Sequence, residues 1–100
     1  MILTEKEVHQ MTIDKYGKIA MLNKTIEELS ELTRELNDYK YGIGDTLHIL
    51  EERVDVEKML NKLDLIFGIS EKEKKEAGIK KLRRTVERME TVKVFALQID

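Results

Sequence analysis

The sequence contains no cysteine, no proline and no tryptophan, and aromatic residues make up only 5% of it. Without cysteine the chain can form neither a disulfide nor a thiolate metal site, and it has no thiol nucleophile. The remaining composition, 41% hydrophobic and 38% charged, is typical of amphipathic helices around a packed core. Together these features favour helices over strands.

Two further absences bear on partners and location. The formal net charge of -2 lacks the basic excess of a nucleic-acid-binding protein, so we expect no nucleic-acid partner. No apolar run is long enough to span a bilayer, and the first ten residues, MILTEKEVHQ, have neither the basic segment nor the apolar core of a signal peptide. We therefore expect a cytoplasmic protein with no membrane contact.

The length of 100 residues corresponds to one domain, and no linker rich in Pro, Gly or Ser divides the chain. We expect a single domain over residues 1–100, with its core at about 14–90 and a tail at 91–100. The apolar tail, TVKVFALQID from residue 91, fits a strand, a helix extension or an arm that docks on another chain. Because a chain this short buries little surface alone, we expect a homodimer or homotetramer.

Four segments have the periodicity and end signals of helices. Capping-box patterns at Thr4 with Glu7 and at Ser70 with Glu73 predict helices over 5–16 and about 71–89. Apolar residues at 3-and-4 spacing predict two longer helices, over 18–40 and over about 46–67, the second of which ends at Gly68. The sequence therefore predicts an all-α antiparallel helix bundle.

The helix predicted over 18–40 has a row of glutamates beside its apolar face. That face is centred on Leu29, with Glu28 at its margin and with Glu31 and Glu35 further round on the same side. For this helix alone, a solvated acidic face is the simpler interpretation.

In the helix predicted over 46–67, two acidic residues lie where apolar ones are expected. Glu52 falls near the middle of the apolar sector, and Asp55 falls at its edge. Burying an unpaired carboxylate costs several kcal/mol, so Glu52 requires a metal ion, a basic partner or a water-filled cleft. A salt bridge to a neighbouring helix and a metal site both remain open. The apolar members of the sector are Ile49, Val56, Met59, Leu63 and Ile66.

The spacing of these carboxylates suits a shared metal ion. Residues three apart project from the same side of a helix, so Glu28 pairs with Glu31 and Glu52 pairs with Asp55. Two adjacent helices then direct four carboxylates at one position. Mg²⁺ and Mn²⁺ prefer oxygen ligands and retain waters, which leaves coordination positions for phosphate oxygens and a nucleophilic water. The pattern therefore indicates a hydrolase.

The two acidic segments, EELSE at 27–31 and ERVD at 52–55, resemble the paired EExxE and ExxD motifs of the MazG-like family of all-α nucleoside triphosphate pyrophosphohydrolases. The resemblance covers about residues 14–90. Within it, KYGKIAMLNKTIEELSELTREL and ILEERVDVEKMLNKLDLIFGIS resemble the two central helices of the small, single-domain, phage-type members, and KKLRRTVERM resembles their basic last helix.

This resemblance implies a reaction and a set of metal ligands. Members of the family cleave a nucleoside triphosphate between its α- and β-phosphates, which yields a nucleoside monophosphate and pyrophosphate. The implied cofactor is Mg²⁺, with Mn²⁺ as a substitute, and Glu27 is implied to assist catalysis beside Glu28. The implied metal ligands are Glu28, Glu31, Glu52 and Asp55. The base and sugar of the substrate are not specified by these motifs.

The basic segment at 80–88 has two interpretations. The family resemblance suggests a phosphate contact at Lys81 or Arg84, whereas such segments are usually solvated helix faces. The main alternative function is a non-catalytic helical interaction protein whose carboxylates pair with Lys and Arg across an oligomer interface. A carboxylate-bridged di-iron bundle ranks last, because it requires an ExxH motif that neither His9 nor His48 has.

Overall fold

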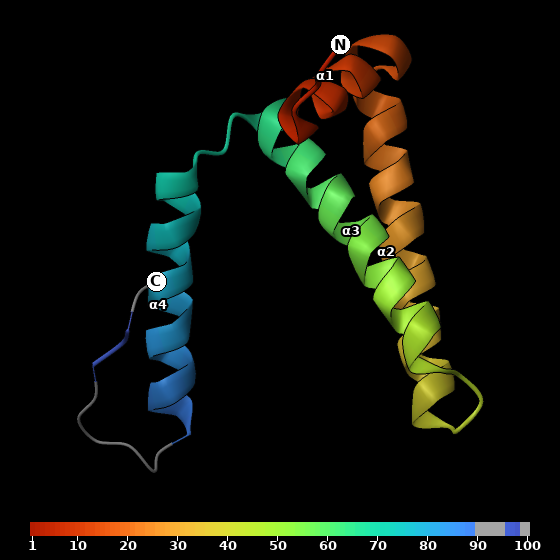
Figure 1. The fold of residues 1–100 in the computed structure, drawn as a ribbon. Helices are drawn as coiled ribbons and strands as arrows, with labels where there is room; N and C mark the ends of the chain where they lie inside the picture. Colours follow the sequence, from red (N-terminus) through yellow and green to blue (C-terminus); the bar gives the residue numbers. More distant parts are fainter. Residues whose placement is uncertain (90–95, 99–100) are drawn as a thin grey trace. The chain divides into compact units, whose positions relative to one another are not determined.

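The computed structural model describes residues 1–89 and 96–98, and all regular structure in these ranges is α-helical. The all-α prediction is therefore confirmed. The helices, labelled in Figure 1, agree with the predicted segments: α1 (Glu5–Tyr16), α2 (Lys18–Lys40), α3 (Thr46–Phe67) and α4 (Glu71–Arg88). Most of the tail predicted at 91–100 lies outside the described residues.

The chain divides into two compact units, Met1–Gly68 and Ile69–Asp100. The first unit contains α1, α2 and α3, and the second contains α4. The single domain expected over the whole chain stays a prediction.

Short-range hydrogen bonds explain where α1 and α3 begin. At α1, the Thr4 hydroxyl accepts from the Glu7 backbone N–H at 3.1 Å, and the Glu7 carboxylate accepts from the Thr4 N–H at 3.4 Å. At α3, the Asp45 carboxylate accepts from the His48 N–H at 2.9 Å. These side chains satisfy backbone donors that have no partner within the helix.

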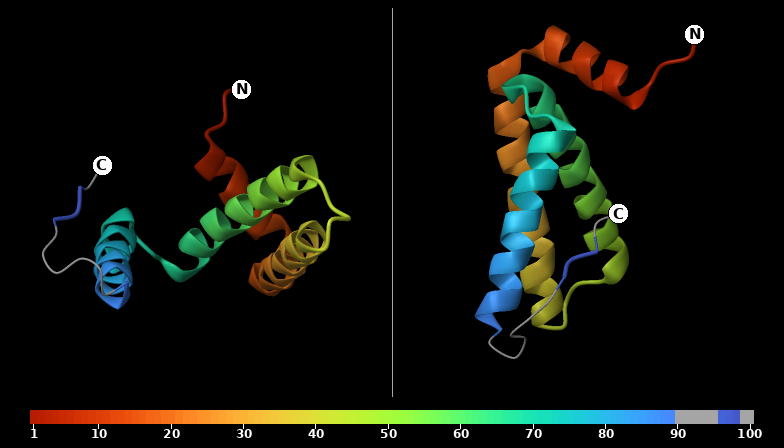
Figure 2. Two further views of the ribbon diagram at one scale, coloured as in Figure 1. Left: turned by 90° about the horizontal axis from the view of Figure 1, so that it is seen from below. Right: turned by 90° about the vertical axis from the view of Figure 1, so that its left-hand side faces the viewer.

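The first unit is built on an antiparallel pair formed by α2 and α3. The two helices run side by side, and α1 lies across the end of the pair where α2 begins and α3 ends (Figures 1 and 2). A short connection joins α2 to α3 and brings Gly44 against the backbone of Tyr39. A Cβ atom at Gly44 would lie 2.9 Å from the Tyr39 nitrogen, closer than real Cβ contacts. The backbone therefore approaches at a point where only glycine fits.

The face that α2 buries is not the predicted one. The buried residues of α2 are Met21, Thr25 and Glu28, whereas Leu29, the expected centre, is 43% exposed. The prediction was wrong because apolar spacing identifies an apolar face without identifying its neighbour. Since α3 is the main neighbour of α2, the face carrying Glu28 is the one that packs against it. Glu28 thus lies inside the interface, where the prediction placed it at the margin.

A polar network fastens α1 to α3. His9 is buried, and its Nε2 lies 3.2 Å from the Glu5 Oε1. The Lys58 ammonium of α3 donates a hydrogen bond to the same Glu5 oxygen. Glu5, His9 and Lys58 are called the α1 network below. The Glu5 carboxylate thus interacts with both nitrogen groups, which lowers the cost of placing its charge at the helix contact.

The second unit consists of α4 and the residues that follow it. Ser70 and Glu73 form the predicted capping box, with hydrogen bonds of 3.1 Å and 3.0 Å. No residue of α4 is buried, and Leu82 is 55% exposed. Across the described part of the chain, no helix combines the length and the apolar character that a membrane crossing requires.

Candidate metal centre

Three carboxylates converge between α2 and α3. One oxygen from each of Glu28, Glu31 and Glu52 lies within 4.8 Å of the other two. Glu28 is buried, and Glu31 and Glu52 are half-buried. The structure therefore brings together three of the four predicted ligands, and this set is called the carboxylate trio below.

The trio is positioned by the helix pair. Glu28 and Glu31 lie on consecutive turns of α2, and Glu52 lies on α3 one turn before the buried Val56. The buried Met21 and Thr25 precede Glu28 on the same face, where the Thr25 hydroxyl donates to the Met21 carbonyl at 2.8 Å. The Thr25 hydroxyl is thereby engaged within its own helix.

The charges of the trio are only partly offset by a basic side chain. The Lys24 ammonium lies 3.1 Å from the Glu28 Oε1 and 3.4 Å from the Glu27 Oε1. The Glu28 Oε2 and the Glu52 Oε2 are buried and have no hydrogen-bond partner. Such oxygens are costly unless a donor or cation meets them. The geometry therefore presents surplus negative charge with unsatisfied oxygens.

This crowding changes the acidity of Glu52. Its pKa is raised from the ordinary value of 4.5 to about 7. Partial burial is the largest cause, followed by the charge of Glu31 and a hydrogen bond with it, and then by the charges of Glu28 and Asp55. The protonated form of Glu52 relieves the repulsion. A bound cation would favour the ionised form for the same electrostatic reason.

The donor set fits a hard divalent cation. All three donors are carboxylate oxygens, which Mg²⁺ and Mn²⁺ prefer. Around one octahedral Mg²⁺, neighbouring oxygens are roughly 3.0 Å apart and opposite oxygens roughly 4.2 Å, since each Mg–O distance is about 2.1 Å. The three oxygens lie within 4.8 Å of one another, so binding one ion would draw them closer together.

The other predicted site residues lie outside the trio. Asp55 is exposed on α3, although its charge contributes to the pKa of Glu52. Glu27 is exposed, and Glu35, which was expected at the surface, is half-buried. Lys81 and Arg84 are exposed on α4, in the second unit.

Lys24 is the charged neighbour that the sequence analysis missed. It lies four residues before Glu28, at the spacing at which side chains on one helix form ion pairs. This pairing raises the pKa of Lys24, mainly through its hydrogen bond to Glu28. The four-residue spacing between Lys24 and Glu28 is the sequence feature that could have predicted this ion pair.

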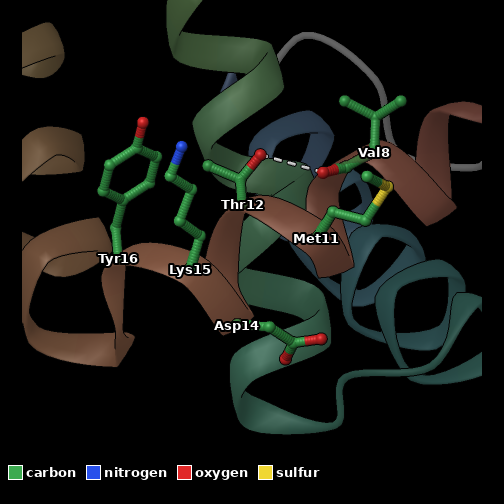
Figure 3. A pocket seen from close by; sticks show the side chains of 6 residues that line it. All are labelled: Val8, Met11, Thr12, Asp14, Lys15 and Tyr16. Carbon is green, nitrogen blue, oxygen red and sulfur yellow. Dashed lines mark hydrogen bonds between the residues drawn. The ribbon is translucent and has the colours of Figure 1, made fainter.

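A pocket of roughly 630 Å³ lies elsewhere, along α1 (Figure 3). Val8 and Met11 give it an apolar lining, and its polar groups already interact within α1. The Thr12 hydroxyl donates to the Val8 carbonyl at 2.8 Å, and the Lys15 ammonium lies 5.4 Å from the centre of the Tyr16 ring. None of the predicted metal ligands lines this pocket. The trio is therefore the stronger candidate site.

Comparisons with known proteins return no match: no protein-family model, no curated protein and no solved structure is similar to the chain.

Proposed function

We propose that the chain is a metal-dependent nucleoside triphosphate pyrophosphohydrolase of the MazG-like type, with Mg²⁺ or Mn²⁺ as its cofactor. The observation that carries the proposal is the carboxylate trio, in which Glu28, Glu31 and Glu52 converge and two buried oxygens lack partners. The order of the EELSE and ERVD segments supports the family assignment. The substrate is a ribo- or deoxyribonucleoside triphosphate, and the products are the monophosphate and pyrophosphate.

In this proposal the trio holds the cation, and its neighbours complete the site. Asp55 adds negative charge one turn beyond Glu52 on α3. The exposed carboxylate of Glu27, beside Glu28, can accept a hydrogen bond from a water and orient it. When bound, the cation neutralises charge that develops on the phosphate oxygens.

The phosphate contact that the family resemblance suggests at Lys81 or Arg84 stays a prediction, because these residues belong to the second unit. Lys81 and Arg84 of α4 are exposed, as a phosphate contact requires. We include them in the proposal on the strength of the basic segment that contains them. Substituting each with Gln is expected to raise the KM for the nucleotide more than it lowers kcat, because a charge that binds ground state and transition state alike affects binding first.

The test is a screen of ribo- and deoxyribonucleoside triphosphates with Mg²⁺, with both products identified. Wild type is expected to release intact pyrophosphate and to place solvent oxygen on the monophosphate. Glu52→Gln is expected to lower kcat by roughly 10²-fold or more, the size of a lost electrostatic stabiliser. The matched control is Glu51→Gln, which removes an exposed carboxylate from the adjacent position. Release of inorganic phosphate, or equal losses in the two variants, would contradict the proposal.

One observation favours a second candidate, a non-catalytic helical interaction protein. The ion pair between Lys24 and Glu28 shows that part of the trio's charge is met from within the chain. In that case Mg²⁺ and Mn²⁺ would leave the melting temperature unchanged and no triphosphate would be cleaved. Metal titration with thermal melting therefore separates the two functions.

A further inference from the structure

Lys24 links two neighbouring carboxylates of α2 at the edge of the trio. Its ammonium lies 3.1 Å from the Glu28 Oε1 and 3.4 Å from the Glu27 Oε1. Positions three and four residues apart lie on one side of a helix, so one long side chain at position 24 reaches both carboxylates. Lys24 therefore connects a member of the trio to the exposed carboxylate that is proposed to orient a water.

The two partners of the ion pair between Lys24 and Glu28 lie in different surroundings. The Glu28 side chain is 9% exposed, whereas the Lys24 side chain is 47% exposed. A lysine can lay its aliphatic stem along a helix and keep its charged end close to water. Lys24 thus reaches a buried carboxylate from the solvent side of the contact between α2 and α3.

The two oxygens of Glu28 differ in their partners. Oε1 pairs with the Lys24 ammonium, whereas Oε2 is buried and has no hydrogen-bond partner among the described residues. The Glu52 Oε2, on the other helix, is buried and unpartnered in the same way. The ion pair therefore engages one oxygen of Glu28 and leaves the other available to a cation.

This ion pair adds little to the stability of α2 as a helix. A glutamate four residues before a lysine pairs more favourably than the reverse order, and here the lysine comes first. A half-exposed lysine also loses conformational entropy when its side chain is held in one geometry. An effect of Lys24 on the orientation of Glu28 can therefore be separated from an effect on folding.

We propose that Lys24 is a positioning residue of the metal centre: its ammonium holds the Glu28 Oε1 and thereby presents the Glu28 Oε2 to the cation. The inference rests on the proposed function, because the cation is the one assigned there to the trio. Groups that hold metal-binding side chains in place typically change metal affinity by roughly 10- to 100-fold. Lys24 binds no cation itself, and its ammonium keeps its contact with Glu28 when the site is filled.

The first test is the Kd for Mg²⁺, measured by titration calorimetry without nucleotide. Lys24→Met is expected to raise this Kd roughly tenfold or more. The direction is informative, because removing a positive charge beside a cation site would by itself tighten binding. Lys24→Arg keeps a charged donor and is expected to restore most of the affinity. The matched control is Lys40→Met, which removes the same charge from the last turn of α2 and should leave the Kd unchanged.

Circular dichroism checks that each variant keeps its helix content, and Lys24→Gln provides a second neutral substitution. A Kd equal to or below that of wild type in both neutral variants would overturn the inference and leave the metal centre in place. If Mg²⁺ does not bind wild type, the inference and the proposed function both fail. If wild type binds Mg²⁺ but cleaves no triphosphate, the proposed function alone fails.

The second test follows the Lys24 ammonium by nitrogen-15 NMR. Its signal is identified by its absence from the spectrum of Lys24→Met. Because Lys24 is proposed to keep its contact with Glu28, this signal is expected to stay at its ion-paired position when Mg²⁺ is added. A shift to the position of a solvated lysine would show that the cation displaces Lys24 from Glu28, and would overturn the inference.

Discussion

The α1 network and the carboxylate trio are two polar clusters at helix contacts of the same unit, and their carboxylates are paired to different extents. In the α1 network, one carboxylate, Glu5, interacts with both Lys58 and His9. In the trio, the Lys24 ammonium pairs with Glu28, and the buried Oε2 atoms of Glu28 and Glu52 have no hydrogen-bond partner among the described residues. In the first cluster the carboxylate is paired, although the His9 Nδ1 is buried and has no hydrogen-bond partner among the described residues. In the second cluster the atoms without partners are carboxylate oxygens, which we propose a cation meets.

The two clusters also shift acidity in opposite directions. Hydrogen bonds with Lys58 and then His9 lower the pKa of Glu5 below 4.5. Burial and neighbouring carboxylates raise the pKa of Glu52 to about 7. Ionisation of Glu5 therefore stabilises the fold, whereas ionisation of Glu52 opposes it in the absence of a cation. This difference gives each cluster its own experimental signature.

The largest expected effect is the response of the trio to metal. Mg²⁺ at a hundred times its Kd is expected to raise the free energy of unfolding of wild type by roughly 2.7 kcal/mol, because the ion binds only the folded state. Glu52→Gln is expected to abolish this gain, which thermal melting with and without Mg²⁺ measures. Glu51→Gln should keep it, as should Glu5→Gln in the α1 network. If Mg²⁺ stabilised Glu52→Gln as much as wild type, the trio would not differ from the α1 network in its response to metal.

A smaller effect is expected from pH in the metal-free protein. Because the pKa of Glu52 is raised to about 7 in the folded state, folded protein binds more protons than unfolded protein between pH 4.5 and 7. The melting temperature in EDTA should therefore fall as the pH rises through this window. Glu52→Gln has no such proton to lose and should show a flatter profile there. Parallel profiles for the two proteins would contradict the charge crowding described for the trio.

The smallest effect is expected in the α1 network. Glu5 has a lowered pKa, so its stabilising ion pair is present above pH 4.5 and is lost as the pH falls through the folded-state pKa. Glu5→Gln should melt slightly below wild type at neutral pH, because exposed ion pairs contribute little. The two melting curves should converge in acid. A difference in melting temperature that grows in acid would contradict the stabilising effect assigned to the ionised Glu5 carboxylate.

The helix ends could be predicted from the sequence because they depend on neighbours in the chain. Thr4 with Glu7 and Ser70 with Glu73 form their capping boxes within four residues, and no distant contact is needed. The apolar sector of α3 was also predicted correctly, with Val56 and Met59 buried.

The inner face of α2 could not be predicted in the same way. This helix has two partly apolar faces, and the one with the more regular leucine spacing, around Leu29, is the one left exposed. Which face is buried depends on where α3 lies, and helix periodicity does not contain that information. For the trio, the spacing rules identified Glu28, Glu31 and Glu52 as candidates. The contact between the helices determined that these three meet and that Asp55 stays outside.

The close approach at Gly44 and the cap at Asp45 fix where α3 begins, and thereby which side of that helix carries Glu52. One residue added within the first turn of α3, beyond this fixed start, would advance the rest of the helix by about 1.5 Å and turn it by about 100°. Glu52 would then leave the side of α3 that faces Glu28, while every ligand remained unchanged in the sequence. An insertion at this point is therefore expected to abolish metal binding even though it alters no carboxylate.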